Sequence, residues 1–278
     1  VYIIFLPAAG LVNTMLPTFA RHPIVGYNWV VMAVIATGFI SFGLWVHHMF
    51  AVGIPLLSLS FFSAASMAVA IPTAIQVFCW IATLWSGRTV MSTPMLYILG
   101  FLFIFVLGGL TGVMVALVPF DWQVHDTHFV VAHLHYVLFG GMVFPMFAAF
   151  YYWLPLLSGR EPSLRLSRVA FWTIFIGFNV TFLPMHLTGL WGMPRRVYTY
   201  LPGLGWDPLN FISTVGGFLS AVGVAILVVD VILHFIAGKP VKPNVWNAGT
   251  LEWAVPTPVP PYNFASQPQV DDREPLWK

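Results

Sequence analysis

Seven long runs of apolar residues fill most of the chain and restrict its fold more than any other feature. A helix that crosses about 30 Å of hydrocarbon needs about 20 apolar residues. The runs are long enough for this, and they cover approximately residues 2–20, 27–49, 56–85, 93–118, 128–156, 168–190 and 210–237. Hydrophobic residues make up 59% of the chain and charged residues 7%, which a soluble domain of this size could not bury. Because the runs are continuous rather than alternating, they predict an all-α polytopic membrane protein rather than a β-barrel.

The predicted transmembrane bundle takes up residues 1–237, and a Pro-rich tail at 238–278 is expected outside the membrane. The chain has no initiating methionine and opens inside an apolar run, so we expect it to be the later part of a longer polypeptide. A single cysteine, Cys79, excludes an internal disulfide and a cysteine-rich metal site. The net charge of +2 comes with no basic patch, so no nucleic-acid partner is expected.

The loops between the runs divide the basic residues unequally between two sides. One side carries Arg21, Arg88, Arg160, Arg165, Arg168, Lys239 and Lys242. The other side carries essentially Arg195 and Arg196. The positive-inside rule places the first side and the tail in the cytoplasm or mitochondrial matrix. The outer arginine pair suits bidentate carboxylates or phosphates, with lipid-headgroup anchoring as the alternative.

The head of the fifth run, Val124–His135, holds four histidines and an aspartate. Ionisable residues at membrane depth are costly and usually mark function. Residues two apart on a helix point about 200° apart, so His133 and His135 face opposite sides and each can hold its own metal. Neutral imidazole is a common axial ligand of haem iron. The alternative is a pair of hydrogen-bonded core histidines.

Two further groups of polar residues have ligand chemistry. His47 and His48 diverge by about 100° on a helix, so both can reach one ion at a helix end. Imidazole-only sites suit copper, zinc or non-haem iron, and the sequence offers no third ligand close by. Asp121, His125 and Asp126 precede the fifth run, where carboxylate oxygens and one imidazole suit Mg²⁺ or Mn²⁺. A helix cap is the alternative role for Asp126.

Several phrases in combination are typical of one family. They are Trp45–Gly53, His125–Tyr136, Gly192–Arg196, and Leu251–Trp253 followed by Pro260–Tyr262. By these phrases the chain resembles subunit I of the haem-copper terminal oxidases, the aa3-type cytochrome c oxidases in particular. The resemblance covers roughly the second half of that twelve-helix subunit. It implies reduction of O₂ to water with electrons from cytochrome c, coupled to proton translocation. It also implies oxidase subunits II and III as partners, in a bacterial cytoplasmic membrane rather than the mitochondrial inner membrane.

The same resemblance implies a role for each histidine of the two pairs. His133 would be the axial ligand of the oxygen-binding haem, and His135 one of two ligands of the low-spin haem, both haems being A-type. His47 and His48 would be two of three copper ligands. Tyr2 would be the redox tyrosine, because Val1-Tyr2 is similar to the end of the family's His-Pro-Glu-Val-Tyr motif.

The resemblance also gives roles to the outer polar residues. Arg195 and Arg196 would pair with haem propionates, with Asp121 and His125 nearby. His125 and Asp126 would bind Mg²⁺ or Mn²⁺ together with subunit II.

The chain departs from the family in the proton route beneath the active site. The family uses a Thr-x-x-Lys pair, whereas this chain has Thr73 and Gln76, and Asn13 stands where a serine is usual. A glutamine can order water but cannot take up a proton as a cation, so loading of protons by this route is in doubt.

Three alternatives remain at this point. A quinol oxidase of the same family would differ in its electron donor. Nitric oxide reductase, a distant relative with non-haem iron, is disfavoured by Tyr2. A polytopic transporter or haem-carrying assembly factor would leave the combination of phrases unexplained.

Overall fold

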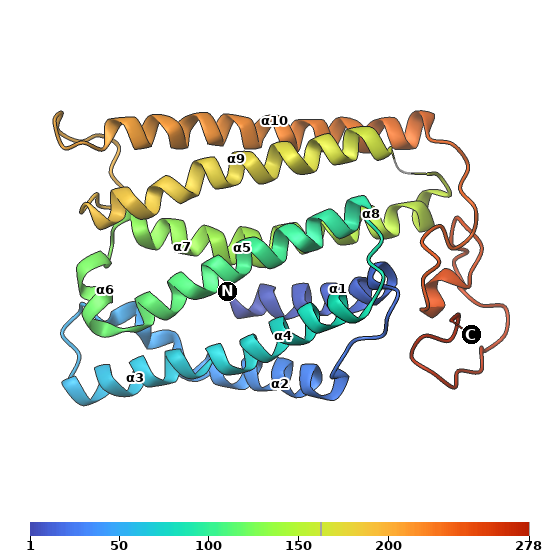
Figure 1. The fold of residues 1–278 in the computed structure, drawn as a ribbon, viewed down its shortest axis with the longest axis horizontal. Helices are drawn as coiled ribbons and strands as arrows, with labels where there is room; N and C mark the ends of the chain where they lie inside the picture. The colour runs from blue at the N-terminus through green and yellow to red at the C-terminus, as the bar shows by residue number, and fades with distance from the viewer. Residues whose placement is uncertain (162, 278) are drawn as a thin grey trace.

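The computed structural model describes residues 1–161 and 163–277, which form a bundle of long helices (Figure 1). The helices are α1 (Tyr2–Ala20), α2 (Tyr27–Leu44), η1 (Trp45–Met49), α3 (Leu56–Ala68), α4 (Ala70–Ser86), α5 (Thr93–Ala116), α6 (Val118–Val124), α7 (His128–Leu138), η2 (Phe139–Val143), α8 (Phe144–Ser158), α9 (Leu164–Leu190), α10 (Asp207–Ala237) and η3 (Leu251–Trp253). Among the described residues they make seven stretches that are long and apolar enough to cross a membrane. The observed stretches fall close to the predicted runs. The prediction of an all-α membrane protein with about seven spanning helices is therefore confirmed.

Three of the seven stretches combine more than one helical element, and in two of them a proline lies close to the change. A proline cannot donate a backbone hydrogen bond to the carbonyl four residues earlier. Pro72 cannot pair with Ala68, and α3 ends at Ala68. Pro145 cannot pair with Gly141, which lies in the π-helical turn η2 between α7 and α8. Such turns occur frequently at functional sites.

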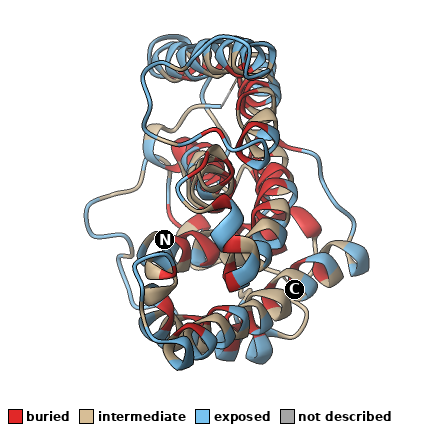
Figure 2. Cartoon of the chain, turned by 90° about the vertical axis from the view of Figure 1, so that its left-hand side faces the viewer, coloured by how far each residue is buried: buried red, intermediate tan, exposed pale blue. Residues whose placement is uncertain are grey.

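Helix α5 lies next to α7, α8 and α9 and brings them into close packing. At Gly108 a side-chain carbon would lie 2.9 Å from the backbone of Tyr136, so only a glycine lets α5 and α7 approach this closely. The buried residues gather along the facing sides of the helices, whereas the outer faces of α10 and α2 are largely exposed (Figure 2). The core is rich in aromatic rings, including stacked Phe5 and Phe105.

Two ends of the bundle can be distinguished. The tail end holds the loops after α1, α4 and α8 together with the C-terminal tail (right in Figure 1). There Arg88 donates to the carbonyl of Ala20, and Arg21 donates to that of Asn247 in the tail. The other end, named here the α6 end, holds α6 and the loops after η1 and α9. The histidine pair of η1 and the head of α7 lie toward the α6 end.

Candidate functional site

His133 projects from α7 toward α5, where its imidazole is held from one side. Its Nδ1 lies 3.1 Å from the carbonyl oxygen of Gly108 and 3.1 Å from the hydroxyl of Thr111. Because a carbonyl only accepts, Nδ1 carries the ring proton and Nε2 keeps a free lone pair. Gly112 makes room for the ring, since a side-chain carbon there would lie 3.0 Å from Cε1 of His133.

His135 lies against a different helix. Its Nδ1 is 2.7 Å from the carbonyl oxygen of Val131, one turn earlier in α7. Its ring stacks on Phe182 of α9, with centroids 4.1 Å apart and planes 15° apart. The spacing of two residues thus directs the two imidazoles to opposite neighbours of α7. Each has its Nδ1 proton bonded to a carbonyl and its Nε2 free, which is the usual orientation of a metal-binding histidine.

His47 and His48 converge at the end of α2. Their Nε2 atoms lie 3.1 Å apart, and Nδ1 of His47 is 3.0 Å from the hydroxyl of Ser66. That hydroxyl donates to the carbonyl of Phe62, so it accepts the Nδ1 proton of His47. Nε2 of His47 then carries no proton and keeps its lone pair. Imidazole binds first-row metals at about 2 Å, so one ion could bind both nitrogens.

A complete metal-ligand cluster is not formed by the described residues alone. Within 1–161 and 163–277, no group of three or more histidine, cysteine or carboxylate side chains is placed to hold one ion. The chain therefore offers two imidazole ligands at η1 and single ligands on the two faces of α7. Tyr2, at the start of α1, is half-buried and packs against the aromatic core.

The outer polar residues form two pairs instead of one cluster. His125 Nδ1 lies 2.8 Å from the carboxylate of buried Asp121. Burial raises the pKa of Asp121, and the hydrogen bond with His125 opposes this shift. Asp126 instead pairs with Arg195, whose backbone N–H also donates to the carbonyl of Asp126. Arg196 is exposed. His125 and Asp126, predicted as joint metal ligands, thus have different partners in this structure.

The residues of the predicted proton route lie where α4 meets α1 and α2. The carboxamide oxygen of Asn13 accepts from the indole of buried Trp80 at 2.6 Å. Gln76 is fully buried and donates to the hydroxyl of Thr37 at 3.3 Å, while its oxygen has no partner. Thr73 bonds only within its own helix, to Val69. The contacts of Asn13 and Gln76 join helices, and none of the three contacts links two of the route residues.

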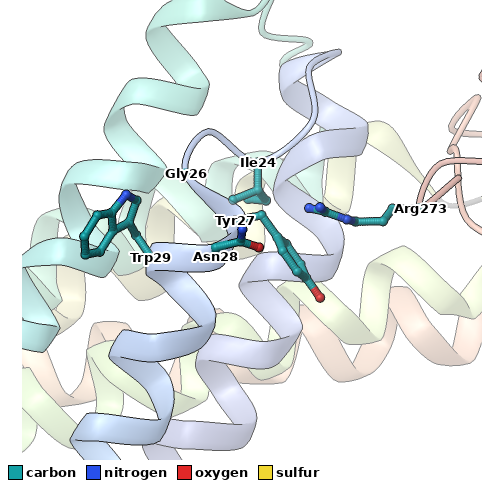
Figure 3. Close-up of a pocket in the computed structure, with 6 residues that line it drawn as sticks. All are labelled: Ile24, Gly26, Tyr27, Asn28, Trp29 and Arg273. Atoms are coloured by element: carbon teal, nitrogen blue, oxygen red, sulfur yellow. The ribbon is translucent and has the colours of Figure 1, made fainter.

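A surface pocket occurs at the tail end and is separate from the histidines. It is lined by Ile24, Gly26, Tyr27, Asn28, Trp29 and Arg273 (Figure 3). The guanidinium of Arg273 lies 3.7 Å from the centre of the Tyr27 ring. No predicted site residue lines this pocket. It forms where the tail lies against the turn between α1 and α2.

Several residues that position the histidines escaped the sequence analysis. They are Ser66, Gly108, Thr111 and Phe182. The glycines of the Gly108–Gly112 stretch were a usable signal, because small residues in a membrane helix mark close helix packing. Phe182 gave no signal, since it is one of many phenylalanines in apolar runs.

The structure shows a bundle with seven helical stretches able to cross a membrane, two histidines on opposite faces of α7 and a histidine pair in η1. Residues 1–219 match the family model for cytochrome c and quinol oxidase polypeptide I. The chain therefore belongs to this family.

Individual relatives agree with the family match. The chain is 47% identical, over its whole length, to cytochrome c oxidase subunit 1 of Alkalihalophilus pseudofirmus, of which it covers 44%. It is 46% identical over its whole length to cytochrome c oxidase subunit 1 of Bacillus subtilis, of which it covers 45%. It is also 44% identical over 99% of its length to quinol oxidase subunit 1 of Bacillus subtilis, of which it covers 43%. The chain thus spans less than half the length of these relatives.

A solved structure shows the same arrangement of helices. The structure of a haem-copper terminal oxidase dimer matches with a TM-score of 0.78 over 88% of this chain and 48% of that one. The sequences are 23% identical, so this likeness concerns the fold.

Proposed function

We propose that this chain provides the ligand-bearing later part of the catalytic subunit of a respiratory terminal oxidase that reduces O₂ to water. The observation that carries the proposal is the arrangement of four imidazoles. His133 and His135 present free Nε2 atoms on opposite faces of α7, and the Nε2 atoms of His47 and His48 lie 3.1 Å apart. This is the donor set that two haems and a copper ion require from these helices.

In this proposal each histidine is oriented by a specific partner. His133, oriented by Gly108, would hold the oxygen-binding haem, and His135, oriented by Val131 and Phe182, would hold the low-spin haem. His47 and His48 are two copper ligands. The haems and copper would supply the redox chemistry and the O₂ binding, which no side chain of the chain provides. The protein fixes the tautomers and ring planes through the Nδ1 bonds.

The remaining site residues act around these ligands. Tyr2 is the redox tyrosine beside the copper ligands. Arg195 and Arg196 neutralise haem propionates, with Asp121 nearby, and His125 and Asp126 bind Mg²⁺ or Mn²⁺. Because Arg195 is paired with Asp126 in the chain alone, this role requires the guanidinium to exchange or share its carboxylate partner.

The electron donor is proposed to be cytochrome c, acting through a copper centre in subunit II. Quinol is the second candidate, because a quinol oxidase subunit of Bacillus subtilis is nearly as similar as the cytochrome c oxidase subunits. We further propose subunits II and III as partners, A-type haems, coupling to proton translocation, and a bacterial cytoplasmic membrane. Residues 1–237 would form the membrane part, with the tail at 238–278 on the cytoplasmic side.

The proposal is tested on the purified complex that contains the whole subunit. A carbon-monoxide difference spectrum after dithionite reduction should show one haem that binds CO and one that does not. His133→Ala should abolish the CO-responsive band, whereas His135→Ala should remove the CO-insensitive haem. Oxygen consumption with reduced cytochrome c or with a quinol then identifies the donor. A complex in which no haem responds to CO would refute the oxidase proposal.

A further inference from the structure

A second buried polar group lies in the membrane part, away from the histidine ligands. Asp230 of α10 is 1% exposed and stands seven residues before the end of that helix at Ala237. One turn further on, His234 is 4% exposed. Both lie toward the tail end, on the opposite side of the bundle from α6. Residues four apart share a helix face, so the carboxyl and the imidazole point to the same side of α10.

The surroundings of Asp230 contain no positive charge that pairs with it. The hydroxyl of Tyr151 in α8 donates to one carboxyl oxygen, Oδ2, at 3.0 Å. The other oxygen, Oδ1, is buried without a hydrogen-bond partner. Across the part of the chain that the structure describes, the ion pairs are Asp121–His125 and Asp126–Arg195, so none involves Asp230.

The arginines near this cluster have other partners or are exposed, and the nearby Tyr97 is an uncharged phenol. Arg160 donates from its guanidinium to the carbonyl of Gly238. On α9, Arg165 and Arg168 are exposed. On α5, Tyr97 is fully buried, its ring stacks on Tyr151 with centroids 6.0 Å apart, and its hydroxyl has no partner.

The hydrogen bonds of Ser158 indicate that Nε2 of His234 carries a proton. The Ser158 hydroxyl donates to the carbonyl of Leu154 at 2.8 Å and accepts from the backbone N–H of Arg160. Its remaining lone pair lies 2.7 Å from Nε2 of His234. Nε2 therefore carries the proton, and the buried Nδ1 is an acceptor without a donor. As a neutral ring, the imidazole has its Nε2 proton bonded to Ser158, and its Nδ1 accepts no hydrogen bond.

An ionised carboxylate in this position would be buried with the Tyr151 hydrogen bond, the Ser163 hydroxyl nearby and no counter-ion. Such a group is expected to bind a proton and become neutral, because the cost of burying an unpaired charge is far larger than the cost of protonation. A proton on Oδ1 would also give the cluster a hydrogen-bond donor that it lacks. This donor would lie on the same face of α10 as Nδ1 of His234.

We propose that Asp230 is a proton-binding site, a neutral carboxylic acid at neutral pH, with its proton on Oδ1 and Tyr151 bonded to Oδ2. The ligand is a proton taken up at the tail end, where His234, one turn further along α10, is hydrogen-bonded to Ser158 beside the loop after α8. This proposal does not depend on the roles of the other histidines.

Infrared spectroscopy of the membrane complex tests the proposal directly. A neutral carboxylic acid has a carbonyl stretching band that a carboxylate lacks. The wild type should show this band at pH 7, and it should shift when the complex is moved into D₂O, because an accessible proton exchanges. The isosteric change Asp230→Asn should remove the band. Asp207→Asn, an exposed position on the same helix, should keep it.

Tyr151→Phe provides a second, independent variant. It removes the hydrogen bond to Oδ2, so the band should persist at a higher wavenumber, because the carbonyl bond is stronger without a donor. This result can be read even if Asp230→Asn does not assemble. The proposal is overturned if Asp230→Asn and the wild type have the same carboxylic acid bands, or if Tyr151→Phe leaves every band in place. A band that does not shift in D₂O would overturn the access from the tail end.

Discussion

Gly112 offers the sharpest test of how the chain positions His133, the proposed haem ligand. A methyl group at this position would lie 3.0 Å from Cε1 of His133, whereas carbon atoms pack best at about 3.5–4.0 Å. The ring would have to move by about 0.5 Å. It is held by bonds of 3.1 Å from Nδ1 to Gly108 and Thr111, and such a movement would take them outside the normal range of about 2.7–3.2 Å.

Gly112→Ala should therefore weaken the haem site that His133 serves. Changing the partners of a metal ligand typically costs 10- to 100-fold in metal affinity or activity, and we expect a loss of about that size in oxygen consumption. The CO-responsive haem band should fall or shift in parallel. Overpacking of a core site costs about 1–3 kcal/mol, which agrees with this range.

Gly109→Ala is the matched control for Gly112→Ala, because it lies on the same helix and its added methyl group would meet nothing within 4 Å. It should keep both the CO band and the turnover. Equal behaviour of the two variants would refute the reasoning, since it would mean that the His133 ring is free to move aside.

Three further changes test other parts of the structure. Phe182→Ala removes the ring stacked on His135, a contact of about 0.5–1.5 kcal/mol, and should shift the absorption of the CO-insensitive haem while leaving the CO-responsive band unchanged. Gln76→Lys should leave both haem spectra unchanged but alter proton uptake when the copper site is reduced; identical uptake kinetics would contradict a role for this position. Burial, with repulsion from nearby carboxylates, raises the pKa of Glu274 in the tail to about 7, from an ordinary value of 4.5. The folded tail then binds a proton that the unfolded tail has already released, so its docking should weaken as the pH rises from about 4.5 to about 7. Limited proteolysis across this range should show the change, and Glu274→Gln should abolish it whereas the exposed Asp271→Asn should not.

The helical fold was predictable because its cause is local. Each apolar run is nearly as long as the helix it forms, so length and composition were sufficient. The interruptions were less visible. Pro72 and Pro145 do lie where α3 ends and where the π turn forms, but a proline in a membrane helix does not by itself reveal which irregularity it produces.

The histidines of the candidate site stand out in the sequence, whereas the residues that orient them do not. His133 and His135 were distinctive because polar rings in an apolar helix are costly. Their partners on α5 and α9 depend on contacts between residues more than 20 positions apart, which one sequence does not encode locally. Asp230 is also an ionisable residue in an apolar helix and was nevertheless missed, because it lies outside the recognisable phrases.

The two ligands on α7 are held by separate supports, and this separation has a measurable consequence. His133 depends on Gly108 and Thr111 of α5, whereas His135 depends on a carbonyl of its own helix and on Phe182 of α9. Perturbations without shared partners usually add within about 0.3–0.5 kcal/mol. The Gly112→Ala and Phe182→Ala changes should therefore combine additively, each in its own haem band. If the effects of the double variant differ strongly from the sum of the two single effects, α7, which carries both rings, must move as a unit. In that case one helix would transmit changes at one haem to the other, and the separate hydrogen bonds would not isolate the two sites.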